Sequence, residues 1–318
     1  RLQLYNSGRL RLQTRGRAAL KSRNFVALRQ GREICEDRFM QIAFRTHDLG
    51  VKGLQNAIQK ARNCGISAVQ LVVYKFMDEI KYAPNQLNAE NAAAIGAALK
   101  QSGISVPLIG AYFNPVHSDK SRVANGIAVF KEYLRYCTAL GCNIVGSETG
   151  SFNDDKWTYN PLNRTEQALQ TVIHTFGGLA AYAKQYGAYV GMEGAAGHVC
   201  WNVATLKRAI DAINADNIRI IFDIYNYLDA SNYQSYLQIL DEGLTAFAGK
   251  IAVFHIKDCV FEDGRLKQVA VGKGVFDFYK LLGKIKAYDK NAVLVLEGTT
   301  GDDIVPCMEY VKAIWRQV

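Results

Sequence analysis

Apolar and polar positions follow two alternating periods along most of the chain. From Met40 onward, short apolar or β-branched runs are separated by amphipathic stretches of helical length, in units of roughly thirty to forty-five residues. Strands that alternate with helices favour parallel pairing, because a parallel crossover needs about the length of one helix. The eight runs are Ile42–Phe44, Val69–Val73, Val106–Ile109, Asn143–Val145, Tyr189–Met192, Ile218–Phe222, Ile251–Phe254 and Ala292–Leu296.

The junctions between these runs carry helix-end signals. Glycine suits the left-handed backbone that follows a helix, and candidates stand at Gly65, Gly103, Gly141 and Gly187. Candidate N-caps precede four helical patterns at Asn88, Asp119, Asn202 and Ser231. Eight strand–helix units, with no GxGxxG after the first strand, predict a closed (β/α)8 barrel rather than an open doubly wound sheet. Since no linker interrupts residues 40–318, we expect a single α/β barrel domain there.

The formal net charge of +9 is concentrated at the N-terminus. Residues 1–39 carry nine Arg and one Lys against three acidic residues, a net of +7, which leaves +2 for residues 40–318. Such a basic, aperiodic lead is typical of a transit peptide, a nucleic-acid arm, or non-native sequence before a natural start at Met40. We favour the last and treat 1–39 as an N-terminal extension outside the fold, disordered or non-native.

Cysteine and hydropathy patterns favour a cytoplasmic protein. The seven cysteines are scattered and form no CxxC pair, which a reducing compartment explains better than a disulfide framework. The sequence has no apolar run of ~18 residues that would indicate a membrane span.

Ionisable residues follow four consecutive runs, at the barrel end where active sites of this fold lie: Glu193, Asp223, His255 and Glu297. Three carboxylates brought together there cannot all stay ionised without a counter-ion, and a divalent cation is the simplest one. Mainly oxygen ligands with one imidazole favour Mn²⁺, with Co²⁺, Mg²⁺ and Zn²⁺ as alternatives, over Ca²⁺. Lys257 is the alternative source of positive charge.

At these positions the chain resembles the xylose isomerase-like sugar phosphate isomerase/epimerase barrels. The resemblance extends essentially from Met40 to the C-terminus, and its short motifs are specific together for the superfamily but not for one reaction. They are Gly191-Met-Glu193-Gly, Phe222-Asp223, Phe254-His255-Ile-Lys-Asp258, Leu296-Glu297-Gly298 and Gly272-Lys-Gly274-Val-Phe-Asp277-Phe.

The resemblance implies that Glu193 and Glu297 both bind the metal and move protons on opposite faces of the substrate. Asp223 and His255 would serve mainly as ligands. The substrate would be a keto sugar or related polyol, which one glutamate deprotonates to a metal-stabilised enediolate and the other reprotonates. We therefore expect a metal-dependent sugar isomerase or epimerase.

The chain departs from the ketose 3-epimerase pattern at Asn226, where those enzymes carry a histidine. Asparagine can bond a hydroxyl but cannot titrate. His198 is a candidate to replace part of that function, against the alternative of a loop histidine in water. Glu148, after strand four, is either an additional acid–base or hydroxyl-binding group or a structural ion-pair partner.

The remaining candidate substrate-binding residues are His117, Trp157 and Lys257. Trp157 lies in the long segment 150–161 with Tyr159, and Trp201 follows strand five; aromatic faces pack against sugar C–H groups, although loop packing is the alternative for each. His174, within a predicted helix, is expected to be an ordinary partly buried histidine.

Other reactions and functions stay open at this point. Inosose dehydratases and C-glycoside deglycosidases use the same scaffold and begin with the same proton removal. An endonuclease IV-like DNA repair enzyme would need three zinc ions, more histidines and a basic face, so we expect no nucleic-acid partner. A non-catalytic sugar-binding barrel would not need proton-transfer glutamates. The sequence leaves the exact substrate, its phosphorylation and a homo-oligomeric assembly open.

Overall fold

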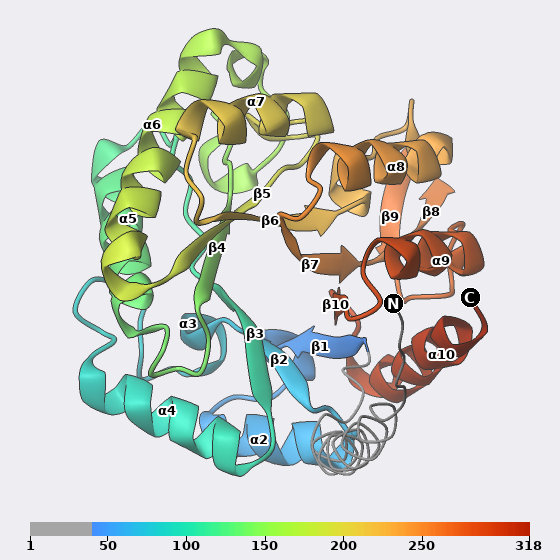
Figure 1. The fold of residues 1–318 in the computed structure, drawn as a ribbon, viewed down its shortest axis with the longest axis horizontal. Helices are drawn as coiled ribbons and strands as arrows, with labels where there is room; N and C mark the ends of the chain where they lie inside the picture. The colour runs from blue at the N-terminus through green and yellow to red at the C-terminus, as the bar shows by residue number, and fades with distance from the viewer. Residues whose placement is uncertain (1–39) are drawn as a thin grey trace, which may run out of the picture. The chain divides into compact units, whose positions relative to one another are not determined.

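Eight parallel strands close into a barrel with helices around it, which confirms the (β/α)8 prediction (Figure 1). The computed structural model describes residues 40–318; the predicted extension 1–39 lies outside the described residues. The strand order around the barrel is β1-β10-β7-β6-β5-β4-β3-β2. The barrel strands are β1 (Gln41–Arg45), β2 (Ala68–Leu71), β3 (Ser105–Gly110), β4 (Ile144–Glu148), β5 (Tyr189–Glu193), β6 (Ile218–Asp223), β7 (Ile251–Ile256) and β10 (Val293–Leu296).

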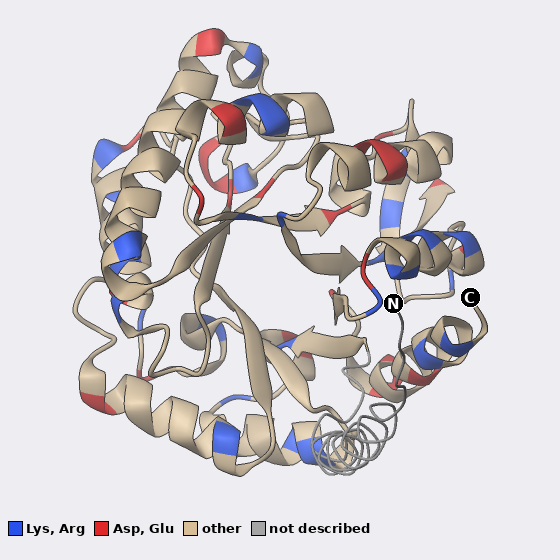
Figure 2. Ribbon diagram, viewed as in Figure 1, with Lys and Arg blue, Asp and Glu red and all other residues tan. Residues whose placement is uncertain are grey.

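The outer helices alternate with these strands. They are α2 (Leu54–Asn63), α4 (Ala89–Gln101), α5 (Lys120–Tyr136), α6 (Glu166–Ala183), α7 (Val203–Ile213), α8 (Tyr236–Ala246), α9 (Phe278–Tyr288) and α10 (Ile304–Gln317), with the single turn α3 (Val73–Phe76). Short 3₁₀ turns are η1 (Thr46–Leu49), η2 (Asp154–Lys156), η3 (Pro161–Arg164), η4 (Lys184–Tyr186), η5 (Tyr225–Tyr227), η6 (Tyr233–Ser235) and η7 (Gly301–Asp303). Basic and acidic residues are interspersed over these helices (Figure 2). Within the described part of the chain, every helix is too short or too polar to cross a membrane.

The helix-end signals are confirmed with one exception. The four predicted glycines all have positive φ, and Asn88, Asp119 and Asn202 cap α4, α5 and α7 through their side chains. Ser231 is wrong as a cap, because its hydroxyl donates to Asp229 and α8 begins only at Tyr236, after a 3₁₀ turn. His174 lies in α6 as predicted but is exposed rather than partly buried.

The barrel interior is filled by small and branched side chains, mostly one from each strand. A cluster of buried residues is formed by Ala43, Ala68, Leu108, Ile221, Val253 and Val295. On β4, a Cβ at Gly146 would lie 2.3 Å from Cδ1 of Ile221, so this glycine leaves the space that Ile221 occupies. A larger core fills the space between sheet and helices. The barrel is therefore packed, and only its mouth is available for polar chemistry.

A β-hairpin that the sequence analysis missed follows β7. β8 (Asp258–Glu262) pairs antiparallel with β9 (Arg265–Val269) across Asp263-Gly264, both with positive φ. The Asp-Gly pair is a hairpin signal in its own right. The amide of Gln268 in β9 donates to the backbone oxygen of Glu297 at 2.9 Å, so the hairpin supports one of the expected metal ligands.

The buried carboxylate of Asp258 organises the glycine-rich segment after this hairpin. Its oxygens accept hydrogen bonds from the backbone amides of Cys259, Gly272, Gly274 and Phe276. A Cβ at Gly274 would lie 2.2 Å from Asp258 Oδ1, and Gly272 has a φ of +83°. The Gly-Lys-Gly run is thus required by the close approach of backbone to carboxylate.

Candidate metal centre

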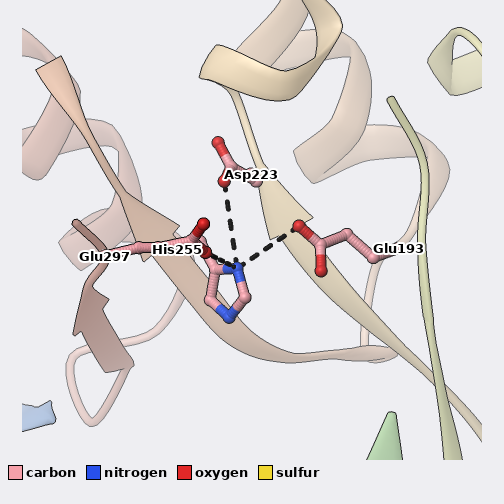
Figure 3. Close-up of side chains that lie close together, drawn as sticks. All are labelled: Glu193, Asp223, His255 and Glu297. Atoms are coloured by element: carbon pink, nitrogen blue, oxygen red, sulfur yellow. Dashed lines mark ion pairs between the residues drawn. The ribbon is translucent and has the colours of Figure 1, made fainter. Parts of the chain in front are cut away.

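Four side chains meet at the C-terminal mouth of the barrel. Glu193 and Asp223 end β5 and β6, His255 lies near the end of β7, and Glu297 directly follows β10. One ligand atom from each residue lies within 4.8 Å of the others. Glu193, Asp223 and His255 are buried. Figure 3 shows the three carboxylates around the His255 ring, with Glu193 and Glu297 on opposite sides.

The donor atoms suit a small divalent cation. His255 Nδ1 lies 3.3 Å from Glu193 Oε1, 3.8 Å from Asp223 Oδ2 and 2.8 Å from Glu297 Oε2. Glu193 Oε2 is buried and has no hydrogen-bond partner among the described residues, which is costly unless a cation or another bound ligand satisfies it. A spread of 4.8 Å or less could be bridged by one cation with ligand bonds of ~2.1 Å. These four residues therefore form a candidate metal site.

The protonation of His255 depends on its acidic neighbours. Burial favours the neutral ring, but the charges of Glu193 and Glu297 outweigh it and raise the pKa of His255 to about 10. At neutral pH the imidazole therefore carries a second proton and a positive charge, as long as only this charge balances the carboxylates. A cation that bound Nδ1 would take the place of that proton, so metal binding here would release acid.

Lys257 supplies part of the counter-charge for the carboxylates, as the sequence analysis had proposed as an alternative to a metal. Its buried ammonium lies 2.9 Å from Asp223 Oδ2 and 2.8 Å from Glu297 Oε1. Burial opposes the charge, yet these carboxylates raise the pKa of Lys257 well above its ordinary value. One positive charge against three carboxylates leaves the centre two charges short of balance when the imidazole is neutral.

Arg45, at the end of β1, does not close that gap. Its Nη1 lies 2.7 Å from Glu297 Oε1, but Nε and Nη2 donate to the carboxylate of Asp48. Asp48 also accepts from the backbone amide of Gly298 at 2.9 Å. The Arg45–Asp48 pair is neutral as a unit and holds the Glu297 segment in place. The remaining charge of −2 matches a divalent cation.

A glutamine that the sequence analysis missed orients the imidazole. Gln70 of β2 is fully buried, and its Oε1 lies 2.9 Å from His255 Nε2. Its Nε2 in turn donates to the hydroxyl of Tyr112. Because an amide oxygen only accepts, Nε2 of His255 carries the hydrogen, and the Nδ1 lone pair can face a cation. The available signal was a polar residue inside a strand that is otherwise apolar.

Comparison with known proteins decides the family. A family model described as xylose isomerase-like TIM barrel matches residues 58–313. The chain belongs to this family. The search of curated proteins found no match.

Several solved structures share the fold of this chain at low identity. A D-tagatose 3-epimerase-like protein has a TM-score of 0.69 at 17% identity, over 88% of this chain and 98% of that one. An IOLI protein with a bound zinc atom has a TM-score of 0.66 at 16% identity, over 86% and 96%. A probable 3-DHS dehydratase, AsbF, from Bacillus anthracis has 0.62 at 14%, over 87% and 98%. At these identities the likeness shows the fold alone.

In this xylose isomerase-like barrel, Asn226 is hydrogen-bonded to residues of the candidate metal site. Its Nδ2 donates to Glu193 Oε1 at 2.8 Å, and its Oδ1 accepts from Lys257 at 2.9 Å. Its backbone amide donates to Asp223 Oδ1. The side-chain amide that was expected to bond a substrate hydroxyl therefore already has a protein partner on each side, and it orients Glu193.

Beside the centre, the buried His198 pairs with Glu148, whose side chain is 26% exposed. His198 Nε2 lies 3.4 Å from Glu148 Oε2, and its ring centroid is 5.3 Å from that of Trp157. The alternative of a loop histidine in water is wrong, because His198 is buried, which lowers its pKa to about 4. Burial and then the charge of Glu297 raise the pKa of Glu148 to about 7. A carboxyl that titrates near neutrality suits proton transfer.

The other rim histidines stand outside the candidate metal site. His117, after β3, accepts at Nδ1 from the amide of Asp119 at 2.9 Å and lines a cavity together with Trp157. His47 lies beside Asp48, 3.9 Å away. Tyr159 and Trp201 both pack against the guanidinium of Arg164, with centroid distances of 5.1 and 4.3 Å. Of the rim histidines, only His255 belongs to the candidate metal site.

Proposed function

We propose that this protein is a metal-dependent isomerase or epimerase of a keto sugar or related polyol. One divalent cation would be held by Glu193, Asp223, His255 and Glu297. Mn²⁺ is the first choice for this ion, and Co²⁺, Mg²⁺ and Zn²⁺ are the alternatives. The observation that carries the proposal is the position of two glutamates on opposite sides of the same centre (Figure 3). The likeness to an epimerase-like protein and to a zinc-bound barrel supports it.

The two glutamates differ in their hydrogen bonding, and this suggests separate tasks. A cation bound at the centre would polarise the substrate carbonyl as a Lewis acid. Glu193 has Oε1 fixed by Asn226 and Oε2 without a partner among the described residues, so Oε2 can accept the proton on the carbon beside the carbonyl. Glu297 Oε1 is paired with Lys257 and Arg45, which leaves Oε2, beside His255, as the atom that would take up a proton from solvent and deliver it to the opposite face of the substrate, while Glu193 keeps the proton it removed.

Elimination is the second candidate reaction. The raised pKa of Glu148 is the observation in its favour. A carboxyl with a pKa of about 7 is part protonated at neutral pH and can donate to a departing hydroxyl. The likeness to a probable dehydratase is consistent with this alternative. Both reactions begin with the same proton removal by a glutamate.

The test combines metal analysis with a substrate panel. Purified protein should contain one divalent ion per chain, and keto sugars and inososes incubated with it and Mn²⁺ in D₂O would be followed by NMR. Exchange of C–H for C–D without loss of mass indicates isomerisation, and loss of water indicates elimination. Glu193→Gln and Glu297→Gln should each lower turnover by ~10²-fold or more, whereas Glu79→Gln, an exposed control, should not. A metal-free protein whose two variants keep full activity would contradict the proposal.

A further inference from the structure

A large cavity lies on the barrel face that carries the metal centre. Its volume is about 680 Å³, and its lining comes from the segments after β2, β3 and β4 and from the start of α5. At ~30 Å³ per water it holds roughly twenty waters, far more than one hexose of about twelve non-hydrogen atoms displaces. Cavities of ~300–1,000 Å³ are typical of sites for ligands larger than a single sugar ring.

Two residues connect this cavity to the metal centre. Tyr112 lines the cavity, and its hydroxyl accepts from Gln70, the residue that orients His255. Trp157 lines it as well and packs against His198, the partner of Glu148. The cavity therefore lies beside the residues that contact the centre, where β3 and β4 end.

The lining suits a neutral ring. Aromatic side chains contribute to the wall at Tyr82, Tyr112 and Trp157. The only charged pair there is Arg122 with Asp155, whose carboxylate oxygens lie 2.5 and 2.6 Å from the same guanidinium nitrogen, so the two charges cancel. His117 accepts at Nδ1 from the amide of Asp119, and its Nε2 lies 3.3 Å from Arg122 Nη1 and 3.6 Å from Asp155 Oδ1, so this ring is held by the same neutral pair. Aromatic faces set among neutral hydrogen-bonding side chains such as Asn114, Ser121 and Asn125, with no net charge, favour a hydroxyl-bearing or aromatic ring over a phosphate.

We infer that this cavity is a second subsite that takes a ring joined by a glycosidic bond to the reacting sugar. The substrate class is then a glycoside whose second ring is aromatic or another sugar, not a free or phosphorylated monosaccharide. This inference rests on the proposed function, because it assumes that the reacting sugar binds at the metal centre.

Binding of unreactive glycosides to the Mn²⁺-loaded full chain tests the inference without turnover. Calorimetric titrations would compare methyl β-D-glucopyranoside with phenyl β-D-glucopyranoside and cellobiose, and with glucose 6-phosphate. At least one of the two ligands with a second ring should bind roughly tenfold or more tightly than the methyl glycoside, because it buries an additional ring. Which of the two binds more tightly tells whether the second ring is aromatic or a sugar.

A cavity-filling variant gives the decisive comparison. Asn125 lines the cavity from α5, and Asn125→Trp should remove the advantage of the second ring while leaving methyl glycoside binding unchanged. Ala124→Trp adds the same bulk at the next, exposed position and should retain the advantage. Equal affinities, no binding of any glycoside, tighter binding of glucose 6-phosphate, or an advantage that survives Asn125→Trp would each overturn the inference. The expected binding pattern in a chain that fails the keto sugar panel would instead contradict the proposed function alone.

Discussion

The metal affinity of the centre should depend on Gln70. This residue contacts His255 at Nε2 and not at Nδ1, the ring nitrogen that faces the candidate metal site. Gln70 Oε1 accepts the Nε2 hydrogen of His255 at 2.9 Å, and both side chains are buried. Gln70→Leu keeps a similar side-chain size and removes the acceptor. The imidazole then loses the partner that holds its hydrogen on Nε2, and the tautomer with the hydrogen on Nδ1, beside the carboxylates, becomes competitive.

The expected magnitude follows from the buried donor. An unpartnered buried N–H costs roughly 1–3 kcal/mol, and each 1.4 kcal/mol is about tenfold in affinity. Mn²⁺ binding should therefore weaken by roughly 5- to 150-fold, in line with the ~10–100-fold effect of losing such a partner. The dissociation constant would be measured on metal-stripped protein by competition with a chelating dye at fixed pH, for wild type and variant.

Two further variants define the result. Gln59→Leu, on the exposed side of α2, makes the same substitution away from the centre and should leave Mn²⁺ affinity unchanged. Gln70→Glu keeps an acceptor for the His255 hydrogen and should retain most of the affinity. If Gln70→Leu bound Mn²⁺ as tightly as wild type, the assignment of Gln70 as the residue that orients the imidazole would be refuted.

Three other predictions concern stability. Asp258→Asn replaces one of the two oxygens that accept hydrogen bonds from backbone amides, so it should lower the unfolding free energy by about 2–4 kcal/mol. The loss would be measured as a shift in the denaturant midpoint, and an unchanged midpoint would contradict the prediction. Because the pKa of Glu148 is raised to about 7, the folded protein keeps a proton that the unfolded chain releases. Metal-free wild type should thus lose stability, relative to Glu148→Gln, as the pH rises from about 5 to about 8. Melting temperatures of the two proteins that differ by a constant amount over this range would contradict the prediction. Gly243→Ala places a Cβ 2.0 Å from Phe222 Cζ and should destabilise by about 1–3 kcal/mol, whereas Gly178→Ala, which meets open space, should not.

The sequence alone determined the barrel and the residues of the candidate metal site. Periodicity is a local property, so all eight runs became strands, and only their ends differ; Val73, for example, begins α3 instead of extending β2. The meeting of Glu193, Asp223, His255 and Glu297 then follows from topology, because parallel strands in a closed barrel end at the same rim. Asp263-Gly264 carried an equally local hairpin signal that was overlooked.

Only the tertiary structure decided how that centre is balanced and oriented. Gln70 bonds His255 across 185 positions of the chain, and nothing near either residue in the sequence indicates that contact. The position of Lys257 between two carboxylates, the neutral Arg45–Asp48 pair and the burial of His198 likewise depend on packing between separate strands and loops. Charge balance and protonation are properties of distances and burial, which are set only when the barrel closes.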